Sequence, residues 1–320
     1  YYGLNSTCVN TAFALGILAG GFFATYLGWK FLFVLPFISL FTLPSLMKNL
    51  PDEPAEKSGR LDIVGLGLLT LLTLLISVCL NFGSSIYLAA SVVVIALFFL
   101  YIAKCKNAFI SLKFFKNRNY IIAVLLVSVA LGIQSAYSFL FSFMAQTIHE
   151  IALDRVSLII LPSYIIAAFM GMRSGGIVER LGAVKTLFVD IIFLMGTLIL
   201  CVFTLDTTAL MLSICCCLFA GGCALLYAPF MKMVVSTLKP SEIGVGIGFF
   251  NLMTGIGPSL LIVLTGKMMS MEIMKHSFGI VSRESSLYAN ILGAFVLLLL
   301  TVLVVLFLTK KQYEIKAEDI

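Results

Sequence analysis

The stretch that decides the fold is YANILGAFVLLLLTVLVVLFLT, residues 288–309, a predominantly apolar run without a single charged side chain. A helix rises 1.5 Å per residue, so about 20 such residues cross the roughly 30 Å hydrocarbon core of a bilayer. A helix also satisfies its backbone hydrogen bonds within the segment, which lipid requires. The run therefore predicts a membrane-spanning helix.

The same pattern recurs along the chain. Hydrophobic residues make up 61% of its 320 residues and charged residues 11%, whereas a soluble domain carries about 25% charge. This composition excludes a soluble fold and predicts an all-α integral membrane protein. We expect about ten spans, at residues 8–26, 29–47, 63–80, 86–103, 119–145, 157–177, 184–204, 208–231, 243–266 and 288–309.

Positive charge is concentrated in the connectors on one side of these spans, for example at Lys48, Lys104, Arg180 and Lys310. Cytoplasmic connectors of membrane proteins are enriched in Lys and Arg. We therefore expect a multi-pass protein of the cell membrane with both ends of this chain in the cytoplasm. Because the cations are spread over short connectors and form no single surface, we expect no nucleic-acid partner.

Asp190 is the only acidic side chain inside a predicted span. A charge in hydrocarbon is costly, so such a residue is a candidate for function. It can carry a proton or line an inner vestibule, or it can be a helix-end aspartate hydrated from the cytoplasm. The sequence leaves both interpretations open.

Other polar residues lie in the spans at 119–145 and 243–266. Gln134, Ser138 and Ser142 are spaced by four and share one helical face, which predicts contact with a cavity or another helix. In the later span, Asn251 precedes a turn containing Gly255, Gly257 and Pro258, and Pro258 cannot donate to the carbonyl of Thr254. This turn predicts a kink. The kink can serve substrate movement or only close helix packing.

The sequence supports neither an enzyme nor a metal or cofactor site. His149 and His276 lie in outer connectors without a partner at metal-ligand spacing, and no nucleophile elbow, zinc-protease or P-loop motif is present. Six cysteines lie inside apolar runs, where we interpret them as small packing residues: Cys79, Cys201, Cys215, Cys216, Cys217 and Cys223.

Two glycine-containing patterns stand at predicted span ends. GGIVERLG contains Gly175, Glu179, Arg180 and Gly182 and predicts a short polar turn on the cytoplasmic side, where the glycines permit reversal and the charges pair with neighbouring helix ends. ALGILAGGFFATYLGWKFLF contains Gly16, Gly20 and Gly21. Asn10 lies six residues before Gly16, the spacing that separates Asn251 from Gly257, which hints at a duplicated element.

These patterns resemble the major facilitator superfamily, and within it the 14-helix drug/proton antiporters that include tetracycline and quaternary-ammonium exporters. GGIVERLG is similar to the family loop motif G-x-x-x-D-R-x-G, with Glu179 in place of Asp. The earlier stretch resembles the antiporter motif G-P-x-x-G-G followed by G-W-R-x-x-F; Ile17 replaces its proline and Lys30 its arginine. FFKNRNY, residues 114–120, resembles the basic exit loop of the inserted helix pair.

The resemblance implies that this chain corresponds to helices five to fourteen of such an exporter. Residues 1–47 would be the last two helices of the N-terminal bundle. Residues 48–118 would be a cytoplasmic loop, an inserted lipid-facing helix pair and a basic loop, and 119–320 a C-terminal six-helix bundle with a cytoplasmic tail. Tetracycline exporters of this type carry a membrane glutamate where the span 243–266 has no acidic residue, so tetracycline itself is not implied.

The function that the resemblance implies is proton-coupled export of amphipathic or cationic drugs by alternating access, in a monomer embedded in lipid. Its partners would be protons and a small-molecule drug or metabolite. Gln134 and Asn251 would line the pathway, and Asp190 or a residue of the helices that precede this chain would carry the proton. Two alternatives stay open: an importer of a small nutrient or metabolite, and a non-transporting membrane fragment or partner subunit.

Overall fold

A computed structural model describes residues 8, 11–12, 15–16, 19–20, 23–49, 62–83, 85–105, 116–239, 242–276, 279 and 281–318. Within these residues the regular structure is helical, and eight helices are long and apolar enough to cross a membrane. They are α3 (Ile63–Phe82), α4 (Ser85–Lys104), α6 (Arg118–Thr147), α7 (Leu153–Leu181), α8 (Ala183–Thr204), α9 (Ala209–Ser236), α10 (Ile243–Ser270) and α11 (Ser286–Glu318). The predicted all-α membrane architecture is confirmed.

Two further spans were expected near the start of the chain. The expected span at 29–47 consists of a 3-10 helix, η2 (Trp29–Thr42), followed by the short helix α2 (Leu43–Asn49). Of the expected span at 8–26, the structure describes only scattered residues and the π-helix η1 (Phe23–Leu27). The basic connector expected around residues 104–118 lies mostly outside the described residues.

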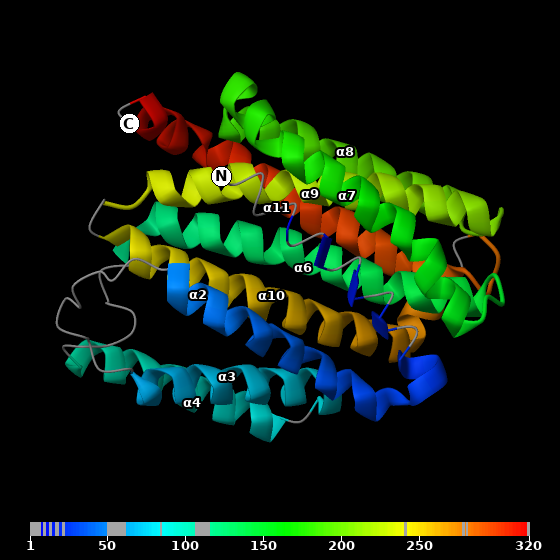
Figure 1. Cartoon of the computed structure of the whole chain (residues 1–320), viewed down its shortest axis with the longest axis horizontal. Coiled ribbons are helices and arrows are strands. Elements are labelled where there is room, and N and C mark those ends of the chain that lie inside the picture. Colours follow the sequence, from blue (N-terminus) through cyan, green and yellow to red (C-terminus); the bar gives the residue numbers. More distant parts are fainter. Residues whose placement is uncertain are drawn as a thin grey trace.

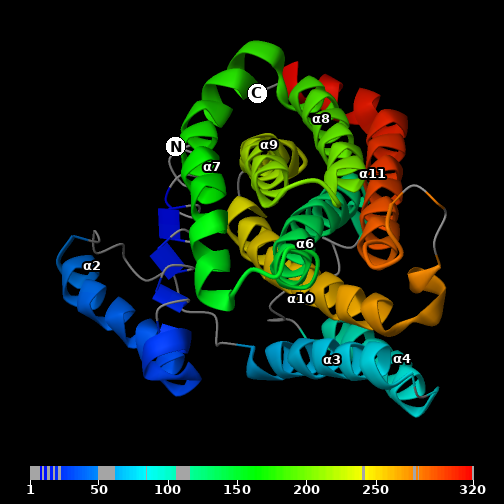
Figure 2. The ribbon, with the colours of Figure 1, turned by 90° about the vertical axis from the view of Figure 1, so that its right-hand side faces the viewer.

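The long helices run side by side along the longest axis of the molecule (Figure 1). Seen along that axis, α9 lies among α6, α7 and α8 (Figure 2), and it packs most extensively against α7 and α8. Large aromatic side chains from several helices fill the core; those that are almost fully buried include Tyr137, Phe141, Phe219, Phe250 and Phe295. Helices α6 to α11 therefore share one hydrophobic core.

The inserted pair α3 and α4 lies against one side of this core. The two helices pack on each other, and α3 also packs on α10 (Figure 2). Asp62 caps α3 by accepting a hydrogen bond from the Gly65 N–H at 2.7 Å, and the Tyr101 hydroxyl of α4 donates to Asp62 Oδ1 at 2.6 Å. This carboxylate therefore joins the start of α3 to the end of α4.

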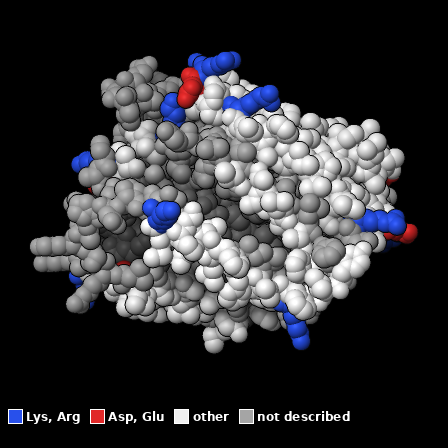
Figure 3. Space-filling view, viewed as in Figure 1, with Lys and Arg blue, Asp and Glu red and all other residues white. Residues whose placement is uncertain are grey.

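The exterior of the molecule is apolar over a broad band. In Figure 3, charged side chains gather toward the ends and edges of the visible face, and a wide expanse of other residues separates them. Large apolar side chains such as Phe82 and Leu308 are 75% and 73% exposed. Soluble monomers rarely expose apolar patches beyond a few hundred Å². This surface is the one expected for a protein surrounded by lipid.

Tyrosine hydroxyls anchor the helix ends near the start of α6. Tyr120 donates to the Gly246 carbonyl of α10 at 2.8 Å, and Tyr313 of α11 donates to the Asn119 carbonyl at 2.7 Å. Tyr313 lies beyond the apolar part of α11, and burial raises its pKa to about 12. These contacts fix the ends of α10 and α11 relative to α6.

Candidate functional site

Asp190 lies about two turns into α8, which begins at Ala183. The side chain is only 4% exposed, and neither of its carboxylate oxygens has a hydrogen-bond partner among the described residues. A helix-end aspartate hydrated by solvent would be exposed, so the burial argues against that interpretation. The structure places Asp190 inside the bundle with its hydrogen-bonding capacity unused.

Asp190 is among the residues that line a cavity of about 710 Å³ formed by α7, α8 and α9, although its carboxylate oxygens are buried. Most of the lining is aliphatic or aromatic, and Asp190 is the one charged residue among the described residues that form it. The Thr186 hydroxyl donates to the Gly182 carbonyl at 2.8 Å and is thereby satisfied within its own helix. The lining residues are Ile166, Met170, Ile177, Leu181, Thr186, Val189, Asp190, Phe193, Ile214, Cys217, Leu218, Gly221, Gly222 and Leu225.

Two glycines of α9 shape the floor of this cavity. A Cβ atom on Gly222 would lie 2.7 Å from Leu194 Cδ2, and one on Gly221 would lie 3.3 Å from Ile166 Cγ2. Glycine therefore lets α9 approach both neighbouring helices. Because α7 and α8 contact each other far less than each contacts α9, the cavity lies between α7 and α8. We call it the Asp190 groove.

The chemistry of the groove follows from its one charged group. An ionised carboxylate without partners in apolar surroundings is unstable by several kcal/mol. It becomes stable when it takes up a proton or when a cation lies beside it. This buried carboxyl group can therefore hold and release a proton.

The polar stripe of α6 faces α7 and does not enter the groove. Ser138 Oγ lies 3.2 Å from the Tyr164 hydroxyl of α7 and donates to the Gln134 carbonyl at 3.1 Å, while Ser142 donates to the Ser138 carbonyl at 3.4 Å. Gln134 is half-buried. The structure thus brings Ser138 to a helix partner that the sequence pattern did not identify, and it keeps Ser138 and Gln134 apart from Asp190.

The glycine-rich turn of α10 packs closely on α6. α10 is continuous from Ile243 to Ser270 with Pro258 inside it. A Cβ atom on Gly257 would lie 2.7 Å from the Ser128 carbonyl oxygen, whereas one on Gly255 would meet nothing within 4 Å. Gly257 therefore allows close helix packing, while a role of the turn in substrate movement stays a prediction. We call this contact, which also includes Gly132, the α6–α10 seam.

Asn251 lies on an exposed face of α10. Only its backbone takes part in a described hydrogen bond, in which its carbonyl accepts from the Thr254 hydroxyl at 2.8 Å. The structure therefore does not bring Asn251 together with Asp190 or with Ser138. An exposed amide within an otherwise apolar span stays available to a neighbouring element or a ligand.

The GGIVERLG pattern lies almost entirely in helix α7 and not in the expected turn. The prediction of a polar turn over residues 175–182 is wrong, because α7 continues as a helix to Leu181 and reverses at a single residue. That residue is Gly182, whose φ of 81° is a left-handed value that glycine adopts without strain. Glu179 and Arg180 are exposed, and neither forms an ion pair among the residues that the structure describes.

The structure describes two of the three glycines of the antiporter-like motif, Gly16 and Gly20. Gly16 is exposed and Gly20 is half-buried, and a Cβ atom on either would meet nothing within 4 Å. Gly21 and Asn10 lie outside the described residues. The described part of the chain therefore gives Gly16 and Gly20 no partner helix.

A second aspartate, Asp206, which the sequence pattern did not single out, lies directly after α8. It accepts hydrogen bonds from the Ser282 N–H at 2.6 Å, from the Ser282 hydroxyl at 2.9 Å and from the Ser285 hydroxyl. Partial burial alone acts to raise the pKa of Asp206, but these hydrogen bonds outweigh it and hold the pKa below its ordinary value. The partners are 76 to 79 residues away, so no local signal could identify them.

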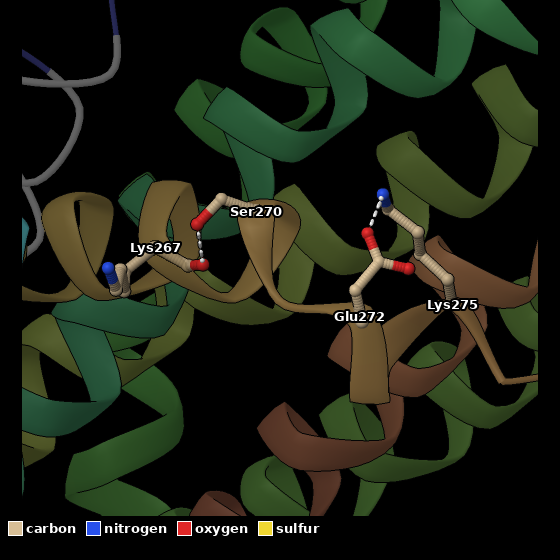
Figure 4. Close-up of polar contacts among 4 residues, drawn as sticks. All are labelled: Lys267, Ser270, Glu272 and Lys275. Atoms are coloured by element: carbon tan, nitrogen blue, oxygen red, sulfur yellow. Dashed lines mark hydrogen bonds and ion pairs between the residues drawn. The ribbon is translucent and has the colours of Figure 1, made fainter.

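Exposed polar contacts lie at the end of α10 and in the segment after it (Figure 4). Lys275 Nζ donates to Glu272 Oε1 at 2.7 Å within the short 3-10 helix η4 (Glu272–Lys275), and Ser270 donates to the Lys267 carbonyl at 2.7 Å. The Lys275 and Glu272 side chains are largely exposed, and exposed ion pairs contribute at most about 1 kcal/mol. This segment therefore provides useful control positions outside the Asp190 groove.

Comparison with known proteins gives a consistent result. A family model described as Major Facilitator Superfamily matches residues 1–262. Similar curated proteins include the quinolone resistance protein NorB of Staphylococcus aureus strain JH9 and its counterparts in strains JH1 and Mu3. Each is 24% identical over 319 residues, which cover 92% of this chain and 65% of the relative. The chain therefore spans 65% of the length of these relatives.

Proposed function

The chain belongs to the Major Facilitator Superfamily, and on that premise we propose that it forms part of an exporter that exchanges drugs for protons. The observation that carries the proposal is Asp190, which is 4% exposed, has no described partner for its carboxylate, and lies beside an apolar cavity. The likeness to proteins named for quinolone resistance supports amphipathic drugs as the substrate class.

Asp190 is the proton carrier in this proposal. A carboxyl group without a hydrogen-bond partner among the described residues responds to whichever side of the membrane supplies a proton. Proton binding neutralises the group, and proton release leaves a charge that favours a different arrangement of α7, α8 and α9. The proton gradient would thereby bias the conformational equilibrium that moves the drug outward.

The drug pathway in this proposal includes Gln134 and Asn251. Gln134 is half-buried on α6, and Asn251 is exposed on α10 although both lie within apolar spans. Amides at such positions bind polar groups of a ligand while nearby apolar side chains contact its hydrophobic body. The exposed Glu179 and Arg180 at the end of α7 would pair with another element in one state of the transport cycle.

Efflux from drug-sensitive cells that express the full-length reading frame tests the proposal. The probes are a quinolone and a lipophilic cationic dye, each measured with and without a protonophore. The variants are Asp190→Asn and the control Glu272→Gln, which makes the same chemical change at an exposed site outside the groove. We expect efflux that collapses with the protonophore, falls strongly in Asp190→Asn and stays normal in Glu272→Gln.

Two results would contradict the proposal. Efflux that is insensitive to the protonophore would exclude proton coupling. Normal efflux in Asp190→Asn would place the coupling carboxylate elsewhere in the full-length protein. Uptake of a small nutrient or metabolite without efflux of any drug would favour the importer.

A further inference from the structure

We propose that the Asp190 groove binds an anionic phospholipid, with an acyl chain lying between α7 and α8 and the phosphate group beside Arg173. The inference does not depend on the proposed function, and it does not use the Asp190 carboxylate, whose oxygens are buried. Three features carry it. The apolar groove opens toward lipid, an exposed arginine lies on the groove face of α7, and further cations lie where the groove ends.

The groove opens onto the apolar exterior of the molecule. Ile166 and Leu181 of α7 are 40% and 52% exposed, and Val189 and Phe193 of α8 are 65% and 45% exposed. All four residues line the groove. Figure 2 shows α7 and α8 on the side of α9 away from the inserted pair α3 and α4. Lipid chains around these membrane-spanning helices therefore reach the groove directly.

The groove has about the depth of one leaflet of the bilayer. Its lining on α7 runs from Ile166 to Leu181, a rise of about 22 Å along the helix. With 29 residues, α7 is about 43 Å long, about 13 Å more than the hydrocarbon core. A helix centred on the core would project about 6 Å beyond each surface. About 16 Å of groove then lies in hydrocarbon, close to the depth of one leaflet, about 15 Å.

Arg173 lies on the groove face of α7. It follows Met170 by three residues and precedes Ile177 by four, both of which line the groove, and residues at these spacings share a helical face. The Arg173 side chain is exposed and forms no ion pair among the described residues. The buried oxygens of Asp190 are not its partner, because they form no described contact. A cation that faces hydrocarbon is costly, so an anion beside Arg173 would be stabilising.

The depth of Arg173 suits a lipid phosphate as that anion. Arg173 precedes the last residue of α7, Leu181, by eight residues, which places it about 12 Å from the helix end and about 6 Å inside the hydrocarbon core. Long basic side chains extend from such positions to the membrane surface. A guanidinium group also binds phosphate oxygens through two parallel hydrogen bonds. The nearest phosphate is that of a lipid whose chain occupies the groove.

Further cations lie where the groove ends, at the reversal from α7 to α8. Arg180 is in the last turn of α7, Lys185 lies four residues before the rim residue Val189, and both cations are exposed. Figure 3 shows several basic side chains at its upper edge, where the same view in Figure 1 has this reversal. Glu179 is the only acidic residue within 173–185. The excess of positive charge favours an anionic headgroup over a zwitterionic one.

Native mass spectrometry of the delipidated full-length protein tests this site. The probes are dioleoylphosphatidylglycerol and dioleoylphosphatidylcholine, which carry the same acyl chains on an anionic and a zwitterionic headgroup. We expect wild type to bind its first phosphatidylglycerol molecule about tenfold more tightly than its first phosphatidylcholine, equivalent to about 1.4 kcal/mol. Equal affinity for the two lipids would overturn the inference.

Two variants separate the contribution of the headgroup from that of the chain. Arg173→Gln removes the charge, so it should abolish most of the preference by weakening phosphatidylglycerol binding and leave phosphatidylcholine binding unchanged. Gly221→Leu places a side chain on the floor of the groove, where even a Cβ atom would lie 3.3 Å from Ile166 Cγ2. It should weaken the binding of both lipids, because both use the groove for a chain.

Two matched controls isolate the groove. Arg155→Gln makes the arginine-to-glutamine change at an exposed position near the opposite end of α7. Gly67→Leu makes the glycine-to-leucine change on α3, where an added Cβ atom meets nothing within 4 Å. Both controls should bind phosphatidylglycerol within about twofold of wild type, a difference of about 0.4 kcal/mol.

The remaining outcomes also decide the question. Unchanged phosphatidylglycerol binding in Arg173→Gln, or an equal loss for both lipids, would overturn the phosphate contact. Full lipid binding in a folded Gly221→Leu variant would show that another occupant fills the groove. If Gly221→Leu fails to fold, Arg173→Gln compared with Arg155→Gln still gives the answer. None of these measurements uses efflux, so this inference can fail while the exporter proposal holds, and the reverse.

Discussion

Asp190 and Asp206 belong to the same stretch of chain, but the fold treats them in opposite ways. Asp206, just past the end of α8, accepts hydrogen bonds from one N–H and two hydroxyl groups. Asp190, inside α8, is 4% exposed and has no described partner. A satisfied carboxylate holds structure together, whereas an unsatisfied one destabilises the fold unless something else neutralises it. The difference supports the proposal that Asp190 is the proton carrier.

The largest effect is expected at Asp190. Asn has the same shape but cannot carry the proton or the negative charge, so Asp190→Asn should reduce proton-dependent efflux by about tenfold or more. Its thermal stability should equal or exceed that of wild type, because no described hydrogen bond is lost. Efflux and thermal unfolding measured on the same preparations separate the two properties. A variant that unfolds at markedly lower temperature would contradict the absence of partners.

A second effect concerns packing rather than charge, and compares Gly257 in the α6–α10 seam with Gly255, which lies outside it. Gly257→Ala would place a Cβ atom 2.7 Å from the Ser128 carbonyl oxygen and 2.8 Å from Ser128 Cβ. Overpacking of this kind destabilises by about 1–3 kcal/mol. Gly255→Ala is the matched control, since its Cβ atom meets nothing within 4 Å. Equal thermal stability of the two variants would contradict the close packing at Gly257.

A smaller effect is expected at Asp206. Asp206→Asn weakens charge-assisted hydrogen bonds at a solvent-exposed site, which should lower the free energy of unfolding by about 1–2 kcal/mol near neutral pH. Drug efflux should change far less than in Asp190→Asn. Thermal unfolding and efflux of the two asparagine variants, compared side by side, test the contrast directly. Loss of efflux in Asp206→Asn with normal thermal stability would contradict the structural role assigned to Asp206.

The pH dependence of thermal stability tests the role of Asp206 independently. The pKa of Asp206 is lower in the folded state than its ordinary value, so its contribution to stability is present above about pH 4 and is lost as the pH falls through the folded pKa. Wild-type protein should therefore lose more thermal stability below about pH 4 than Asp206→Asn does. Identical acid profiles would show that Asp206 contributes nothing.

The smallest effect is expected in the inserted helix pair. Tyr101→Phe removes the hydroxyl that donates to Asp62 Oδ1 at 2.6 Å, and should lower the thermal stability slightly. Tyr87→Phe on the same helix is the matched control, since no contact of the Tyr87 hydroxyl appears among the described hydrogen bonds. A difference in thermal unfolding between these two variants would confirm that the Asp62 contact holds the pair together.

The sequence predicts most of the fold because a helix that crosses the membrane needs an apolar run of about 20 residues, and such runs are visible in the sequence. Every expected span from residue 63 onward corresponds to one of the eight long apolar helices. The reversal after α7 was misplaced because Glu179 and Arg180 suggested a polar turn, whereas one left-handed glycine, Gly182, suffices.

The candidate site was predictable only in its central residue. Asp190 stands out because acidic side chains are rare in spans, but nothing in the sequence shows that α7 and α8 part above Gly221 and Gly222. The Asp206 cluster depends on contacts 76 to 79 residues away, and the Ser138 contact with Tyr164 spans 26 residues. Such pairings depend on how the helices are arranged in space. The order of residues along one helix does not reveal that arrangement.

Proton movement during drug exchange in proteoliposomes tests the central claim most directly. A pH-sensitive dye trapped inside the vesicles reports proton flux when a lipophilic cation gradient is imposed on the full-length protein, with Asp190→Asn and Asp206→Asn measured in parallel. We predict drug-dependent proton flux in wild type and Asp206→Asn, and none above the level of empty vesicles in Asp190→Asn. Full proton flux in Asp190→Asn would contradict the role assigned to this carboxyl group.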